Sequence, residues 1–216
     1  VAVGQNTLYG NLDNVTGAVA IGTSALSSLT SGGGNLAIGY TAGSTISTAS
    51  FNTYVGYESG VGDGTQHSRN TGLGYQTLKS ATSGANNTAI GCSSLTALTT
   101  GSSNVAIGHQ AGDAITTDQN VVVIGKDAYS AQDTSNDAEG SSGHGSGNIA
   151  IGYQVMQSFN QVNCLRNTVI GFQAMSVGST HDPQDSVAIG YRALQGLNDG
   201  DRNVAVGSKT GKAITT

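Results

Sequence analysis

The chain of 216 residues contains 33 glycines, one proline and no tryptophan, and only 10% of its residues are charged. A net charge of −5 with eight Lys and Arg residues excludes the basic surface of a nucleic-acid-binding protein, and no apolar run is long enough to span a membrane. Hydrophobic residues, at 37%, are too abundant for a disordered chain. Since the chain has neither an initiator methionine nor a signal peptide, we expect it to be processed or a fragment.

A short motif ending in glycine recurs twelve times, and each copy predicts a strand. In chain order the copies are VAVG, AVAIG, NLAIG, NTYVG, NTGLG, NTAIG, NVAIG, VVVIG, NIAIG, NTVIG, SVAIG and NVAVG. Their glycines are Gly4, Gly22, Gly39, Gly56, Gly74, Gly91, Gly108, Gly125, Gly152, Gly171, Gly190 and Gly207, spaced 18, 17, 17, 18, 17, 17, 17, 27, 19, 19 and 17 residues apart. Branched residues alternate with a central residue that is mostly alanine, and this period of two is typical of a strand.

Two further positions repeat with the glycine. Four residues before it the chain has Asn35, Asn52, Asn70, Asn87, Asn104, Asn148, Asn167 and Asn203. In stacked coils these amides can pass hydrogen bonds along the stack, as amide ladders do in cross-β structures. Four residues after the glycine, bulky residues such as Leu26 and Leu78 alternate in blocks with glycines such as Gly43, so successive coils are not equivalent.

A repeat of this length predicts a solenoid, because a single coil cannot bury its own apolar face. Twelve coils stacked in parallel at the spacing of β-strands would form a rod about 55–60 Å long. We expect residues 1–216 to form one such domain, with a long insertion at about residues 130–147. The alanine-lined strand face has little to bury except another chain, and this predicts side-by-side association, with three chains as the expected number.

At these motifs the chain resembles a known family. The units NTAIGCSSL, NVAIGHQAG, NIAIGYQVM and SVAIGYRAL are similar to the head repeats of trimeric autotransporter adhesins of the YadA type. They resemble even more closely the GYQA-rich repeats of phage and large-virus tail-fibre proteins. The resemblance covers nearly the whole chain and implies a left-handed parallel β-roll, with three chains around one axis, that serves as an adhesive shaft. The coils of 17–19 residues are longer than those of the bacterial heads, which leaves the turn geometry open.

Motifs of enzymes and of metal sites are absent from the sequence: there is no GxGxxG before a helix, no GxSxG, no HExxH and no Cys/His zinc spacing. His109 occupies a position that is tyrosine in other coils, which favours a surface or ladder role over catalysis. The pair His181 and Asp182 lacks a nucleophile at a defined spacing. We therefore expect neither catalytic residues nor a cofactor.

Three alternatives remain beside this interpretation. A polysaccharide-acting solenoid enzyme would need paired carboxylates, for which the sequence offers the acidic group Asp127, Asp133, Asp137 and Glu139. The same group could hold calcium through its oxygen atoms, although a solvated loop is the simpler interpretation. Ice binding would need a flat threonine array, and we expect the recurring strand threonines to face inward. These threonines are Thr53, Thr71, Thr88 and Thr168.

Aromatic residues follow the glycine in six coils and predict two stripes along the rod. They are Tyr40, Tyr57, Tyr75, Tyr153, Phe172 and Tyr191, and the stripes are separated by Cys92, His109 and Lys126. A sugar-stacking platform is one interpretation, and a structural ladder is the one we favour. Cys92 and Cys164 lie several coils apart, beyond the reach of a disulfide, for which the Cα atoms must lie within about 7 Å.

The function predicted from these features is a structural and adhesive segment, shaft or head, of a trimeric viral or phage tail fibre in the virion. A bacterial trimeric adhesin at the cell surface is the alternative. Connections longer than the repeat, at 130–147, 157–166 and 177–185, would protrude together and contact a host receptor, possible glycans included. The candidate contact residues are Asp133, Asp137, Glu139, His144, His181 and Asp182.

Overall fold

The computed structural model describes residues 1–62, 67–130, 147–157, 164–176, 183–197 and 200–212. Within these ranges the chain contains twelve strands and no helix, hence no helix able to cross a membrane. The strands are β1 (Ala2–Val3), β2 (Val19–Ile21), β3 (Leu36–Ile38), β4 (Thr53–Val55), β5 (Thr71–Leu73), β6 (Thr88–Ile90), β7 (Val105–Ile107), β8 (Val122–Ile124), β9 (Ile149–Ile151), β10 (Thr168–Ile170), β11 (Val187–Ile189) and β12 (Val204–Val206).

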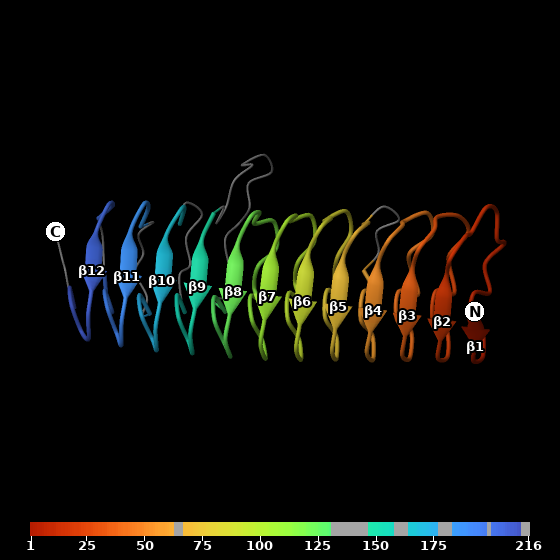
Figure 1. Ribbon diagram of the computed structural model, residues 1–216, viewed down its shortest axis with the longest axis horizontal. Helices are drawn as coiled ribbons and strands as arrows, with labels where there is room; N and C mark the ends of the chain where they lie inside the picture. The colour runs from red at the N-terminus through yellow and green to blue at the C-terminus, as the bar shows by residue number, and fades with distance from the viewer. Residues whose placement is uncertain (63–66, 131–146, 158–163, 177–182, 198–199, 213–216) are drawn as a thin grey trace.

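All twelve strands form one parallel sheet in the order of the sequence. Neighbouring strands pair so that equivalent motif positions lie side by side; Ala20, for example, pairs with Ala37. Figure 1 shows the resulting rod, crossed by its strands, with β1 and β12 at opposite ends. The structure thus confirms the all-β parallel solenoid that the repeat predicts, including its coils of about 17 residues.

In β2 to β12 the central residue points into the coil, and the two flanking residues point outward. Ala37, Ala89 and Ala106 are 0% exposed within the single chain. The expectation that the alanine face meets another chain is therefore wrong. After each glycine the chain turns back and packs residues such as Leu78 and Leu95, also 0% exposed, into the same core. Alanine suits this position because the coil is too thin for a larger side chain beside those leucines.

One coil reverses this pattern of sizes. Tyr54 takes the alanine position of β4 and is fully buried. A Cβ atom at Gly60 would lie 2.5 Å from the Tyr54 ring, and a Cβ at Gly72 or Gly43 would lie 3.1 or 3.3 Å from it. These glycines therefore make the room that the tyrosine fills. At Gly43 and Gly60, glycine in place of the leucine of other coils therefore reflects an exchange of volume with Tyr54.

Each coil turns through residues in the left-handed backbone region. They are the second and fourth residues after the strand-ending glycine and the fifth residue before it; in one coil these are Ser93 (φ 56°), Leu95 (φ 49°) and Asn86 (φ 60°). The strand-ending glycines are more extreme, with φ of +126° at Gly91. A side chain disfavours such angles, so the fold concentrates its backbone strain at fixed positions of the repeat.

Candidate functional site

The outward sheet surface, here called the strand face, consists of the first and third residues of β2 to β12. Its first column is Val19, Leu36, Thr53, Thr71, Thr88, Val105, Val122, Ile149, Thr168, Val187 and Val204, and its second is Ile21, Ile38, Val55, Leu73, Ile90, Ile107, Ile124, Ile151, Ile170, Ile189 and Val206. Every member is at least partly exposed; Leu73, for example, is 46% exposed. The strand face contains no charged residue over the whole length of the sheet.

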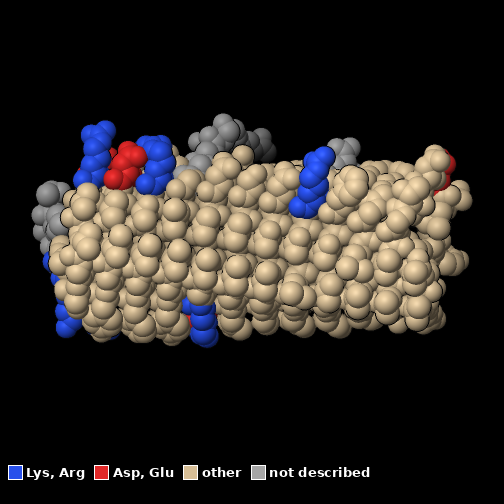
Figure 2. Space-filling view, in the orientation of Figure 1, with Lys and Arg blue, Asp and Glu red and all other residues tan. Residues whose placement is uncertain are grey.

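The strand threonines belong to this outward face, so the expectation that they point inward is wrong. Thr53, Thr71 and Thr88 are partly exposed on consecutive strands, and Thr168 stands alone among aliphatic residues. The strands cross the middle of the view in Figure 1, and Figure 2 shows no Lys, Arg, Asp or Glu there; charged side chains gather at the upper and lower edges. The strand face is therefore uncharged and mostly aliphatic, with threonines as its polar members.

A ladder of buried asparagines connects the coils beside the strands. The Oδ1 atom of Asn87 accepts a hydrogen bond from the backbone N–H of Asn104 at 3.0 Å, and its Nδ2 donates to the carbonyl of Gly101 at 2.9 Å. Asn35, Asn52 and most of the others repeat the first contact with the next coil. The predicted amide ladder is therefore confirmed, with backbone N–H groups as its main donors. It holds successive coils, and thus the strand face, in register.

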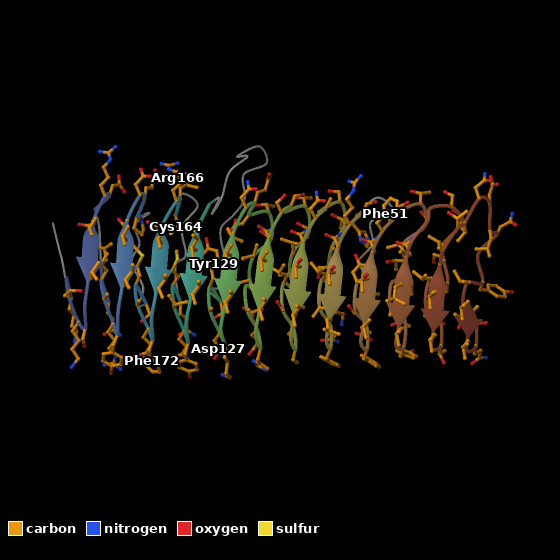
Figure 3. All side chains as sticks on the ribbon, viewed as in Figure 1. Phe51, Asp127, Tyr129, Cys164, Arg166 and Phe172 are labelled. Carbon is orange, nitrogen blue, oxygen red and sulfur yellow. The ribbon has the colours of Figure 1, made fainter. Side chains whose placement is uncertain are left out.

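The residues that directly follow the strand-ending glycines form an edge column. In it the rings of Tyr40, Tyr57 and Tyr75 stack with centroids 5.1 and 5.5 Å apart. Further along, Phe172 stacks between Tyr153 and Tyr191, again at 5.1 and 5.5 Å. These separations are ordinary for offset aromatic stacking. Figure 3 shows Phe172 at the lower edge of the rod, next to the ends of the strands.

A sugar would have to stack on the faces of these rings, but the faces inside each stack are already covered by neighbouring rings. In the second stack, Lys126 lies 5.5 Å from the centroid of Tyr153, while Arg192 and Lys209 lie 5.0 and 5.9 Å from that of Tyr191. Cationic groups therefore lie over the two end rings of the second stack. The geometry favours a structural ladder over a sugar-stacking platform.

Between the two stacks the edge column carries polar groups. The Nζ of Lys126 donates a hydrogen bond to Asp127 Oδ2 at 2.6 Å, which raises the pKa of Lys126. His109 Nδ1 lies 3.7 Å from the other carboxylate oxygen of Asp127. Nearby, burial raises the pKa of the Asp113 carboxyl group. His109 thus lies in the predicted ladder position, and its closest charged neighbour belongs to the next coil.

The candidate contact residues Asp133, Asp137, Glu139, His144, His181 and Asp182 lie outside the described residues. Of the acidic group proposed for calcium or for glycoside chemistry, only Asp127 is described, and it is paired with Lys126. No group of three or more His, Cys, Asp or Glu residues suited to a metal ion occurs in the described part of the chain.

Two residues border the long connections. Arg166 and Asp185 form a bidentate ion pair, with Nε to Oδ1 at 2.6 Å and Nη2 to Oδ2 at 3.0 Å. The hydrogen bonds from Arg166 lower the pKa of Asp185. Because both side chains are largely exposed, the pair contributes little to stability, but it joins coils whose predicted connections would protrude.

Apart from the asparagine ladder, the sequence reasoning missed the buried positions of His67, Tyr129 and Cys164. His67 is 0% exposed, and its Nδ1 lies 2.9 Å from the hydroxyl of Tyr54. Tyr129 is 8% exposed and accepts a hydrogen bond at its hydroxyl from Asn148 Nδ2 at 3.2 Å. Cys164 is also buried, whereas Cys92 lies in the edge column, and the two form no disulfide, as their separation along the repeat predicts. The contact between His67 and Tyr54 had one sequence signal, namely the unusual tyrosine at the centre of the β4 motif.

No protein-family model, no curated protein and no solved structure matches the chain. Functional inference therefore depends on the strand face, the edge column and the repeat itself.

Proposed function

We propose that the chain assembles as a homotrimer through the strand face and serves as a structural, adhesive segment of a viral or phage tail fibre. The observation that carries the proposal is the uncharged, partly exposed and mostly aliphatic strand face, which runs along all strands from β2 to β12. Burying aliphatic side chains that are otherwise in contact with water stabilises association by about 25 cal/mol per Å². The strand face, and not the alanine face, is therefore the surface through which we propose that the chains associate side by side.

A face only two columns wide suits three rods around one axis. Each chain can turn its first column, such as Val105, towards one neighbour and its second column, such as Ile107, towards the other. The resemblance to tail-fibre and YadA-type repeats supports the same number of chains and a left-handed coil. It also supports a role in host attachment rather than an enzymatic one, with a bacterial surface adhesin as the alternative setting.

The mass of the isolated chain in solution tests the assembly. Equilibrium sedimentation should give a mass near three times the 21.5 kDa of one chain. The trimer should persist at high ionic strength, because its contacts are apolar. A mass near 21.5 kDa at micromolar concentration would contradict the proposal.

The attachment role places receptor contact on the long connections at 130–147, 157–166 and 177–185. Three copies of one weak site on a rigid trimer strengthen binding through avidity. Replacing residues 130–147 by a turn of the ordinary repeat length should leave the trimer assembled and weaken its binding to target cells. Equal binding by the shortened and the parent trimers would show that this connection makes no contact with the receptor.

A further inference from the structure

The edge column places three phenol rings within reach of one another on consecutive coils. Tyr40, Tyr57 and Tyr75 stack with interplanar angles of 15° and 12°, at the centroid distances given above. The three residues are 48%, 45% and 48% exposed. An oxidant in solution can therefore reach each ring.

In the described part of the chain, the other tyrosines lack such a partner; Tyr9, which is 78% exposed, lies outside the edge column. Tyr153 and Tyr191 are separated by Phe172, which stacks with both of them. Tyr54 and Tyr129 are 0% and 8% exposed. The chain thus contains two edge stacks of similar geometry, of which only the first has phenols on neighbouring coils.

We propose that Tyr57 and either Tyr40 or Tyr75 form a site of oxidative coupling, at which a one-electron oxidant converts two neighbouring phenols into a dityrosine cross-link. Each phenol loses one electron and one proton to become a tyrosyl radical. The two radicals join through ring carbons ortho to the hydroxyls, and both rings regain aromaticity as the two ortho protons move to the oxygens. The product has lost two hydrogen atoms in total, and the oxidant, a peroxidase intermediate or a photo-oxidised metal complex, has taken up two electrons.

Proximity favours coupling within the chain over coupling between molecules. Neighbouring rings held about 5 Å apart experience an effective concentration far above that of a dilute protein solution. The cross-link would join residues 17 or 18 positions apart in the sequence. Two adjacent coils in the N-terminal part of the rod, either those following β3 and β4 or those following β4 and β5, would then be held by a covalent bond in addition to hydrogen bonds.

The experiment treats the whole chain with a peroxidase and hydrogen peroxide at dilute protein concentration. Intact mass, dityrosine fluorescence and peptide mapping are then measured. The parent should lose two hydrogen atoms while running as a single chain on a denaturing gel. Its cross-linked peptides should join Tyr57 to Tyr40 or to Tyr75.

Two conservative variants separate this geometry from general tyrosine reactivity. Tyr57→Phe keeps the stacked ring but leaves Tyr40 and Tyr75 two coils apart, and it should lower the yield of intrachain dityrosine by about tenfold or more. Adding Phe172→Tyr to that variant should restore the yield, now in peptides joining residue 172 to Tyr153 or Tyr191. Circular dichroism and sedimentation should match the parent for both.

Three outcomes would overturn the proposal. Undiminished intrachain coupling in Tyr57→Phe would show that the reacting pair lies elsewhere. Failure of Phe172→Tyr to restore coupling would show that stacking on adjacent coils is insufficient. Cross-links found only between chains, as dimers on the denaturing gel, would show that contacts between molecules outcompete the edge stack. None of these results depends on the proposed attachment role.

Discussion

The interior of each coil has a nearly constant cross-section, and single side chains share a limited volume within it. Ala106 lies between Ala89 and Val123 of the adjacent strands. It shares the buried core with leucines such as Leu95. Because adjacent coils are only about 4.8 Å apart, a larger residue at this position cannot shift into a neighbouring coil without displacing that coil's own side chains.

Ala106→Leu should therefore destabilise the fold of the single chain, by about 1–3 kcal/mol, through overpacking. Denaturant unfolding of the variant measures this cost. Ile107→Leu, on the outward strand face, is the matched control and should unfold like the parent. If Ala106→Leu unfolded normally but failed to assemble, Ala106 would face another chain after all.

Asn87 connects two coils with both ends of its amide and is 1% exposed. Asn87→Ala leaves the N–H of Asn104 and the carbonyl of Gly101 without these partners. We expect a loss of about 1–3 kcal/mol in the free energy of unfolding, the usual cost of unsatisfied buried groups. The neighbouring Asn86→Gly is the control, because Asn86 is exposed with a positive φ that glycine adopts readily. Equal effects of the two substitutions would mean that the ladder adds no stability of its own.

At the scale of the element, each strand ends where two backbones approach most closely. A Cβ atom at Gly91 would lie 2.4 Å from the carbonyl oxygen of Gly108 in the next coil. The same relation recurs at Gly108, whose Cβ would lie 2.5 Å from the carbonyl oxygen of Gly125. Glycine at this position therefore sets the spacing of the coils as well as the end of the strand.

Gly91→Ala should cost about 3 kcal/mol or more, because backbone strain adds to a steric clash that only movement of the coils can relieve. Gly196→Ala provides the comparison, since its φ is +77° but nothing lies within 4 Å of the added Cβ. That substitution should cost roughly 1 kcal/mol from the backbone angle alone. Thermal unfolding of the two variants measures the difference, and similar melting temperatures would argue against close approach of the coils.

At the scale of the whole molecule, the strand face is the surface whose exposure the single chain leaves unexplained. Ile107 is 36% exposed near the middle of this face. In the proposed trimer, Ile107→Asp would place one carboxylate at each of the three interfaces, where it is removed from water against the first column of the neighbouring chain and has no cationic partner on the strand face.

Ile107→Asp should leave the circular dichroism spectrum unchanged and weaken assembly by about tenfold or more in dissociation constant. Sedimentation over a range of concentrations measures this shift. Thr100→Asp is the control, because Thr100 is exposed in a turn away from the strand face. Assembly that tolerates aspartate at position 107 as well as at position 100 would place the interface elsewhere.

The repeat alone determined the parallel stack, its register and the positions of the asparagine and aromatic ladders. These features depend only on spacing: identical coils place identical positions side by side, so Asn87 meets Asn104 and Tyr40 meets Tyr57. The candidate contact residues, from Asp133 to Asp182, remain sequence predictions because they lie outside the described residues.

Only the tertiary structure decided which side of the strands is inside. An alternation of alanine with branched residues does not show which of the two sets faces the core. Because the branched residues are more hydrophobic than alanine, we expected them to be the buried set. The coil instead encloses Ala106 and leaves Ile107 outward, because the returning chain already fills the narrow interior with leucines. The same packing admitted Tyr54 beside His67, where glycines in the neighbouring coils left room. Residues far apart in the sequence fill the same volume inside a closed coil. A local sequence pattern therefore cannot predict which of them is buried.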